Sequence, residues 1–404
     1  MNPFEESLRK SIKGTVSTHL AERRAVRHDS SIFELTPDYV VAPANARDVE
    51  RLVQQVTAHK QLFPKLSLTP RSAGTDMSGA AIGSSIIVDM TPHFSQIRSL
   101  RGTMLHTQPG VYVRDIDPLL AKAGLQLGSV PASRALCTIG GMVGNNSGGE
   151  QSLRYGNTEH WVRELKVVLA DGKEHTIKPL TKRQLTAKMA EKTFEGTLYK
   201  RTYELIESNY DLLRNARPKT HKNSMGYNLW SVWDKERGIF DLTRLFTGSQ
   251  GTLGILTDIT IEAVPKASHS ELLLLYLPSL RNLGSIIETV MRHQPATFEG
   301  IDDVTFNLGV KYFRTFRRQL GTKEYLRQQA WLLKSVAKFK GHLPALMLMV
   351  EFDGESQAEL HKKLKRSSQT CKVSSYSTIS SPPQRPVHPF GVFVGQRCRS
   401  CATR

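Results

Sequence analysis

The glycine-rich segment over residues 137–158, CTIGGMVGNNSGGEQSLRYGNT, restricts the fold more than any other part of the sequence. Its glycines stand at positions 140, 141, 144, 148, 149 and 156. Because glycine has no Cβ, such a backbone can approach a flat or anionic group closely. A flexible linker is the alternative, but Ile139, Met142 and Val143 are too apolar for one. The segment therefore predicts an ordered loop that contacts a ligand.

Two common nucleotide-binding loops are excluded, because the glycine spacing does not match GxGxxG and nothing in the chain matches GxxxxGK[ST]. The chain has instead a second loop, PRSAGTDMSG over residues 70–79, whose small residues allow successive backbone N–H groups to surround a phosphate. Asp76 lies inside this loop and would repel a pyrophosphate, so we expect its side chain to point away. An ordinary turn is the alternative for these glycines taken alone.

The apolar periodicity predicts a chain of mixed α and β structure. Val49 and Leu52 begin an amphipathic helical pattern after Asn45, a residue that is typical of helix starts. Strand-like runs and loops then alternate as far as Pro265. This alternation is typical of a globular domain rather than of a repeat or a coiled coil.

We divide the chain into four parts. Residues 1–30 are expected to be a charged helical lead-in, residues 31–265 a first domain, and residues 266–365 a second, α+β domain. Residues 366–404 are rich in Ser, Pro and Arg and show no regular period, so we expect a disordered tail, or one foreign to the domain before it.

The formal net charge of +18 is concentrated in two stretches. Residues 362–404 contain nine Lys or Arg and no Asp or Glu. Residues 311–340 are also basic, with aromatic and aliphatic residues among the cations. This second stretch predicts either a helix packed on the second domain or a peripheral contact with an anionic membrane or an electron-accepting partner. No nucleic-acid-binding motif accompanies the charge, so we expect no nucleic acid partner.

Several features favour a cytoplasmic protein. No apolar run approaches the roughly 20 residues that span a bilayer, and the N-terminus lacks the apolar core of a signal peptide. The four cysteines do not form a disulfide framework. Cys398 and Cys401 form a single CxxC, which is half of a metal site, and we interpret it as accidental and expect no metal.

Five segments taken in order carry a family resemblance: SIFELTPDYVVAPANARDVERLV, TPRSAGTDMSG, QPGVYVRDID, the glycine-rich segment, and LTRLFTGSQGTLGILTDITIEAVP. Over roughly residues 30–265 the chain resembles the FAD-binding domain of the vanillyl-alcohol oxidase and p-cresol methylhydroxylase (PCMH) superfamily. It is most similar to the group of D-lactate dehydrogenase, the flavin-binding subunit of glycolate oxidase, and D-2-hydroxyglutarate dehydrogenase, with a truncated or altered C-terminus. The resemblance implies an α+β fold: a two-subdomain FAD-binding domain of the PCMH type followed by an incomplete α+β cap.

The resemblance also implies where FAD binds. The residues at the pyrophosphate would be Pro70, Arg71, Ser72, Ala73, Gly74, Thr75, Asp76 and Gly79. Those beside the flavin and the ribityl chain would be Pro109, Gly110, Pro131, Thr138, Ile139, Gly140, Gly141, Gly144, Asn145, Ser147, Gly148, Tyr155 and Gly156, with Gly254 and Ile255 also near the cofactor. Relatives with a covalent flavin often have His where this loop has Thr75, so noncovalent FAD is expected.

In such enzymes flavin N5 accepts a hydride from the α-carbon of a small 2-hydroxy acid, while a base takes the hydroxyl proton. Electrons would pass to a quinone, a cytochrome or an iron–sulfur protein. The catalytic residues are unknown, and the candidates are His221, Lys222, Tyr227 and Asn228. The match to the family ends near residue 355, before an arginine clamp for the substrate carboxylate is found. The alternative is therefore a catalytically incomplete FAD-binding fragment or subunit that lacks the substrate-domain residues.

Overall fold

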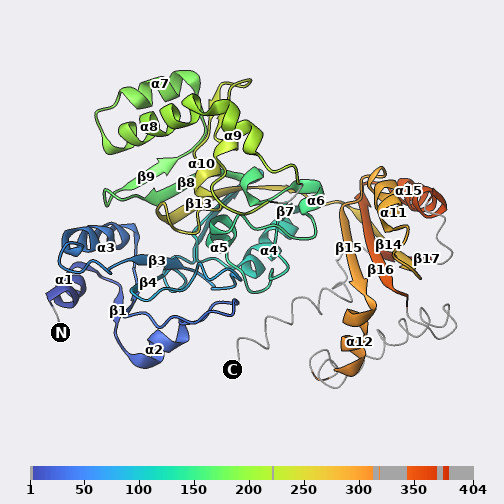
Figure 1. Ribbon diagram of the computed structural model, residues 1–404, viewed down its shortest axis with the longest axis horizontal. Coiled ribbons are helices and arrows are strands. Elements are labelled where there is room, and N and C mark those ends of the chain that lie inside the picture. The colour runs from blue at the N-terminus through green and yellow to red at the C-terminus, as the bar shows by residue number, and fades with distance from the viewer. Residues whose placement is uncertain (1–2, 221–222, 313–317, 319–343, 371–375, 382–404) are drawn as a thin grey trace. The chain divides into compact units, whose positions relative to one another are not determined.

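The computed structural model describes residues 3–220, 223–312, 318, 344–370 and 376–381 of the 404. These residues fall into two compact units that separate after Lys266. Figure 1 shows the elements of both units, which mix helices with sheets. The predicted α+β fold class is confirmed. No helix in the described part of the chain is both long and apolar enough to span a membrane.

The first subdomain of the first unit is a four-stranded sheet in the order β1-β2-β4-β3. Its strands are β1 (Thr15–Ser17), β2 (Tyr39–Ala42), β4 (Ile86–Asp89) and β3 (Leu68–Arg71), and only β1 runs antiparallel to its neighbour. The helices are α1 (Pro3–Ser11), α2 (Leu20–Ala25) and α3 (Ala46–His59). Phe4 and Leu8 of α1 pack with Val49 and Leu52 of α3 in one apolar core.

Two predictions about this subdomain meet different outcomes. The helix expected after Asn45 is present as α3, and the Asn45 side chain accepts a hydrogen bond from the backbone N–H of Asp48. The helical lead-in expected over residues 1–30 is wrong in part, because residues 15–17 form a strand that pairs with β2. Residues 1–30 read as helical because of their charge, whereas the pairing of β1 depends on a strand more than 20 residues away.

The second subdomain is an antiparallel sheet in the order β5-β6-β13-β8-β9, with β7 paired to the end of β13. The strands are β5 (Ile97–Arg101), β6 (Met104–Thr107), β7 (Leu125–Leu127), β8 (Val162–Val168), β9 (Glu174–Ile177) and β13 (Ile255–Pro265). Helices α4 (Val113–Lys122) and α5 (Ile139–Gly144) contribute Ile116, Leu120, Met142 and Val143 to its core. The glycine-rich segment is therefore built into this subdomain through a short buried helix.

Three helices and a small sheet complete the first unit. The helices are α7 (Lys182–Ala190), α8 (Phe194–Ser208) and α9 (Tyr210–Ala216), and the sheet joins β10 (Leu180–Thr181), β12 (Ile239–Phe240) and β11 (Trp233–Asp234). The ring of Phe240 lies within 6.1 Å of the rings of Tyr199, Tyr203 and Trp233. The smaller elements are α6 (Ser152–Tyr155), η1 (Thr158–His160), η2 (Leu229–Ser231) and α10 (Thr243–Phe246).

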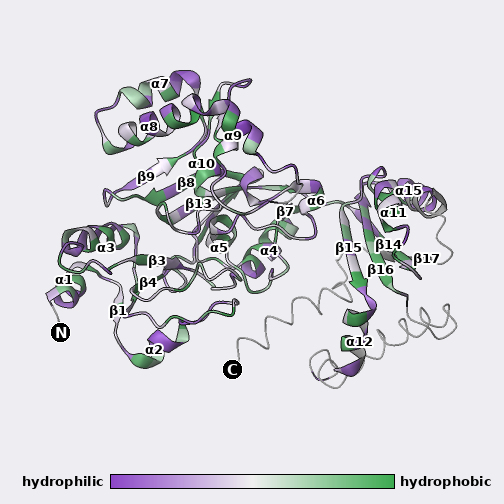
Figure 2. Cartoon of the chain, viewed as in Figure 1, coloured by the Kyte–Doolittle hydropathy of each residue, from purple (hydrophilic) through white to green (hydrophobic). Residues whose placement is uncertain are grey.

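The second unit is an antiparallel sheet in the order β15-β16-β14-β17. Its strands are β14 (His269–Leu277), β15 (Thr297–Asp302), β16 (Leu346–Gly354) and β17 (Tyr376–Ser381), and its helices are α11 (Leu283–Met291), α12 (Asp303–Lys311) and α15 (Gln357–Thr370). Leu273 and Leu275 of β14 pack with Val290 of α11 and Leu360 of α15. Figure 2 shows hydrophobic residues along β14 and β16 and hydrophilic residues on α15.

The tail expected from residue 366 is regular in two places. Residues 366–370 continue α15, and residues 376–381 pair with β14 as β17. The sequence SSYSTISS concealed this strand, because most of its residues are small and polar and its pairing partner lies about a hundred residues away. Residues 382–404, including the CxxC of Cys398 and Cys401, lie outside the described residues.

Candidate cofactor site

The glycine-rich segment meets two other segments that are distant from it in the sequence. Asn145, at the end of α5, donates from Nδ2 to the carboxylate of Asp76 at 2.5 Å. Gln250 donates from Nε2 to Ser78 Oγ at 3.1 Å and from its backbone N–H to the carbonyl of Gly144 at 2.9 Å. The loop over 70–79, the glycine-rich segment and the loop over 248–252 therefore form one cluster, which we call the glycine-loop cluster.

The loop after β3 presents a run of free donors. Among the described residues, no partner accepts from the backbone N–H groups of residues 72–77. Gly74 has φ +63°, in the left-handed region that a curved run of amides requires. Successive free amides of this kind form a concave site for an anion, so the loop fits a phosphate group.

Asp76 is turned toward its own loop and α5. Its carboxylate accepts from the N–H groups of Ser78 at 3.0 Å and Ala80 at 2.9 Å, as well as from Asn145. Burial raises the pKa of this carboxyl, but the hydrogen bonds from Ser78, Ala80 and Asn145 outweigh it and leave the pKa lowered. The amides of residues 78 and 80 are therefore occupied, and the free donors are those of residues 72–77.

The Arg71 side chain holds the loop by hydrogen bonds to backbone carbonyls within the protein. Its Nη1 donates to the carbonyls of Val26 at 3.3 Å and Ala81 at 3.0 Å. Burial lowers the pKa of the guanidinium, and Asp89 and Asp29 oppose this shift. Pro70, one residue earlier, lies against Gly251, where no side chain would fit.

Several glycines of the predicted site are explained by packing within the protein. Gly140 donates its N–H to the carbonyl of Pro109, and a Cβ on Gly140 would lie 2.5 Å from the Pro109 Cβ. A Cβ on Gly110 would lie 2.5 Å from the carbonyl oxygen of Met90. Thr138 accepts from the N–H of Gly141 and so begins α5. The prediction that Gly110, Gly140 and Gly141 contact a cofactor thus has a competing explanation in backbone contacts.

The remaining predicted residues are of two kinds. Gly144 has an open side, because a Cβ there would have no atom within 4 Å. Ile255 is buried among the apolar residues of the first subdomain, and a Cβ on Gly254 would meet Val167. Ile139 is fully buried in the core of the second subdomain. The others are partly or fully exposed: Ser147, Gly148, Tyr155 and Gly156, with Pro131 next to Gly149 and Gly79 next to Phe33.

A buried polar cluster that the sequence did not predict borders this segment. Asn146 and Glu159 exchange two hydrogen bonds of 3.0 Å, and Asn228 donates from Nδ2 to the same carboxylate. The side-chain oxygens of Asn228, Asn157 and Thr247 are buried without a hydrogen-bond partner. Since buried acceptors are rarely left unpaired, these oxygens indicate a missing donor such as a ligand. The one signal in the sequence was Asn146 itself, an asparagine inside the glycine-rich segment, which the structure places at φ +46°.

The catalytic candidates lie only partly within the described chain. His221 and Lys222 lie outside the described residues. The Tyr227 hydroxyl is 2.8 Å from Thr252 Oγ1, and Asn157 donates from Nδ2 to the carbonyl of Asn223 at 2.9 Å. These two contacts bring the segment 223–228 against the glycine-loop cluster.

The free amides of residues 72–77, the open side of Gly144 and the unpaired oxygens of Asn157 and Asn228 fit a cofactor that carries phosphates and N–H donors. The fold and the cluster thus define a nucleotide-cofactor-binding protein. Residues 37–178 match the family of the FAD binding domain, and FAD is therefore the cofactor.

The chain is similar to a D-2-hydroxyglutarate dehydrogenase of Pseudomonas putida, with 27% identity over 76% of this chain and 31% of the relative. It is 28% identical to the glycolate oxidase subunit GlcD of Bacillus subtilis over 68% of this chain and 47% of the relative. An alkyldihydroxyacetonephosphate synthase structure has the same fold, with a TM-score of 0.65, 16% identity, and coverage of 96% of this chain and 65% of the synthase chain.

Residues 37–178 therefore match an FAD binding domain, and the chain is homologous to proteins named D-2-hydroxyglutarate dehydrogenase and glycolate oxidase subunit GlcD. It spans about a third to a half of the length of these two relatives. The predicted resemblance and the predicted cofactor are both confirmed.

Proposed function

We propose that the protein is an FAD-dependent oxidoreductase that oxidises a small 2-hydroxy acid of the D-lactate, glycolate or D-2-hydroxyglutarate class. The observation that carries the proposal is the run of free amides over residues 72–77 next to the glycine-rich segment. The names of the homologous relatives supply the substrate class. We expect the FAD to be noncovalent, because Thr75 stands where covalent relatives have His.

The residues of the cluster have separate tasks. The amides of residues 72–77 would hold the pyrophosphate, with Arg71 and Asp76 fixing the loop from either side. The buried oxygen of either Asn157 or Asn228 would accept from the single N–H of the oxidised flavin ring, at N3. Bound FAD would supply a hydride acceptor for the α-carbon of the substrate. The open side of Gly144 would let the cofactor approach α5 closely.

We propose Tyr227 and Asn228, with His221 and Lys222, as the candidates in the first unit for contact with the substrate hydroxyl. The position of segment 223–228 beside the cluster supports this proposal. Electrons would leave through a quinone, a cytochrome or an iron–sulfur protein. Most of the basic stretch 311–340, which we propose as a peripheral membrane contact, lies outside the described residues.

Two measurements test this function. The purified chain should show the visible absorption of oxidised flavin, and denaturation should release the FAD into the supernatant. A panel of D- and L-2-hydroxy acids with an artificial dye acceptor should then bleach the flavin and give turnover. A protein that stays colourless after incubation with FAD would contradict the proposal.

A second candidate function is an FAD-binding subunit without its own catalysis. It is favoured by Tyr227 and Asn228, whose polar groups already bond to Thr252 and Glu159 within the protein. The panel of 2-hydroxy acids distinguishes the two functions, because a subunit without catalysis would bind FAD but none of the acids would bleach its flavin.

A further inference from the structure

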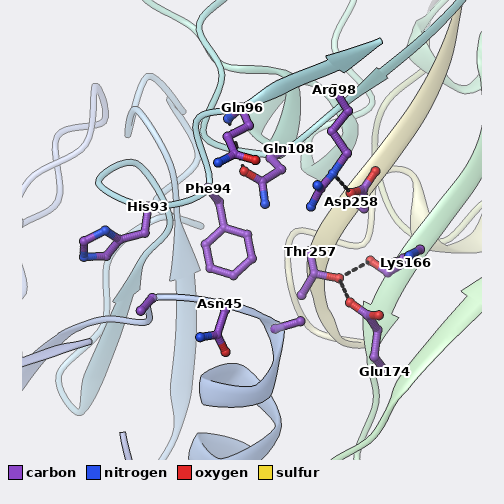
Figure 3. Close-up of a pocket in the computed structure, with 12 residues that line it drawn as sticks. Asn45, His93, Phe94, Gln96, Arg98, Gln108, Lys166, Glu174, Thr257 and Asp258 are labelled. Carbon is purple, nitrogen blue, oxygen red and sulfur yellow. Dashed lines mark hydrogen bonds and ion pairs between the residues drawn. The ribbon is translucent and has the colours of Figure 1, made fainter. Parts of the chain in front are cut away.

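A cavity of about 350 Å³ lies in the first unit, between the start of α3 and the sheet of the second subdomain. Its walls include Asn45 on one side and Arg98, Gln108, Thr257 and Asp258 on the other (Figure 3). Ala46, which follows Asn45 in α3, also lines it. None of its lining residues belongs to the glycine-loop cluster. The cavity is therefore a separate feature, at the lower end of the volumes that enclose small ligands, which start at about 300 Å³.

Gln108 is a buried side chain with unused donors. The residue is 7% exposed, and its Oε1 accepts the backbone N–H of Gln96 at 3.1 Å. Its Nε2 has no partner among the described residues and points into the cavity (Figure 3). The Gln108 amide therefore offers a donor to a ligand that enters the cavity.

Arg98 places a cation next to this amide. Its Nε pairs with the carboxylate of Asp258, which is 8% exposed, and the end of its guanidinium points into the same space (Figure 3). Asp258 is neutralised by this pair, and the second carboxylate of the wall, that of Glu174, accepts the Thr257 hydroxyl at 2.5 Å. Lys166 also lines the cavity and has no ion-pair partner in the described chain. The two cations and the two carboxylates of the lining balance in formal charge, so the feature that favours an anion is the end of the Arg98 guanidinium that points into the cavity.

The opposite wall is the N-terminus of a 14-residue helix. The Asn45 side chain accepts from the N–H of Asp48, and the Asp48 carboxylate accepts from the N–H groups of Lys13, Gly14 and Ala44. The N–H of Ala46 has no partner among the described residues. Free amides and the helix dipole at such an end both favour a negative charge.

We propose that this cavity binds a small anion that carries a carboxylate or a phosphate group. The anion would lie between the N–H of Ala46 on α3 and the donors of Arg98 and Gln108. Three different donors from opposite walls would then bind one acceptor group. The cavity is too small for a dinucleotide, so the anion is a ligand additional to FAD.

Calorimetric titration of the FAD-loaded full chain tests the site, with inorganic phosphate and glutarate as separate probes. Glutarate lacks a 2-hydroxyl and cannot be oxidised as a 2-hydroxy acid. We expect saturable 1:1 binding of one of the two probes, and the preferred probe identifies the anionic group. Absence of saturable binding of both probes below about 10 mM would overturn the proposal, because that corresponds to less than about 3 kcal/mol of binding free energy.

Two variants remove donors while keeping the shape of the walls. Gln108→Glu retains the acceptor for the Gln96 N–H but replaces the amide donor with a negative charge. Ala46→Pro removes the N–H at the first helical position, where proline is favoured and where the extended Asn45 before it is compatible. Each variant should weaken probe binding at least tenfold.

Gln61→Glu, which adds the same charge at an exposed position, should leave probe binding unchanged. Thermal unfolding and the flavin spectrum show that each variant is folded. If one variant does not fold, the other still decides. Probe binding that survives both Gln108→Glu and Ala46→Pro would mean that the anion binds elsewhere, and the proposal would be wrong. The outcome does not depend on turnover of any substrate.

Discussion

Gly74→Ala is the substitution that tests the pyrophosphate loop most directly. Gly74 has φ +63°, and alanine in this region costs about 1–2 kcal/mol. A Cβ at this position would also overlap the guanidinium of Arg71. Arg71 would have to leave its two carbonyl partners, Val26 and Ala81, at about 1.5 kcal/mol for each bond. The free energy of unfolding should fall by about 4–5 kcal/mol in total, and the FAD dissociation constant should rise more than tenfold.

Gly102→Ala is the matched control, because Gly102 has φ +57° and a Cβ there would meet nothing within 4 Å. It should lose only the backbone term of about 1–2 kcal/mol and keep its FAD affinity. Urea unfolding and recovery of flavin fluorescence measure the two quantities. Equal effects of the two variants would show that Arg71 does not brace the loop. A double variant with Arg71→Ala should lose less than the sum of the single changes, since the two residues contact each other.

Three further predictions concern buried groups. Asp76→Asn should lower the free energy of unfolding at neutral pH. Because the folded-state pKa of Asp76 lies below the ordinary 3.8, the stability that its carboxylate contributes is present above pH 3.8 and is lost as the pH falls through the folded-state pKa. The urea midpoints of the original protein and the variant should therefore converge in acid. Burial raises the pKa of the Cys137 thiol to about 12. In a variant that carries Cys371→Ser, Cys398→Ser and Cys401→Ser, a thiol reagent at pH 8 should therefore react with Cys137 only after the chain unfolds. Rapid labelling of the folded chain would refute this prediction. Asn228→Asp should lower the unfolding free energy by more than about 3 kcal/mol, because it places a second carboxylate beside Glu159. Asn228→Ala, which only removes the hydrogen bond, should lower it by about 1–2 kcal/mol. Calorimetric unfolding distinguishes these two values.

Local patterns were sufficient to predict much of the fold. The helix after Asn45 was visible because its cap and its apolar spacing lie within one stretch of sequence. Strand β17 was missed because its stability comes from pairing with β14, and its own residues give little signal. The same reason explains β1, three residues whose strand character depends on β2. Long-range pairing decided each of these cases.

The candidate site shows the same division. Sequence reasoning found the two glycine loops and expected the Asp76 side chain to turn away from a phosphate. It did not find that Asp76 bonds to Asn145, which is 69 residues further along the chain. The partner residue Glu159 was missed as well, because nothing near it in the sequence marks a carboxylate that bonds to both Asn146 and Asn228.

A glycine in this chain can either allow close backbone packing or leave open space, and the sequence alone does not distinguish these two roles. At Gly140 the missing Cβ allows the backbone to contact Pro109, whereas at Gly144 the missing side chain leaves open space. Only the second kind offers room to a cofactor, so Gly144→Ala should affect FAD binding more than stability and Gly140→Ala the reverse. The density of glycines in the sequence predicts where a cofactor would bind, whereas the free amides of residues 72–77 and the open side of Gly144 indicate which backbone groups a ligand can reach.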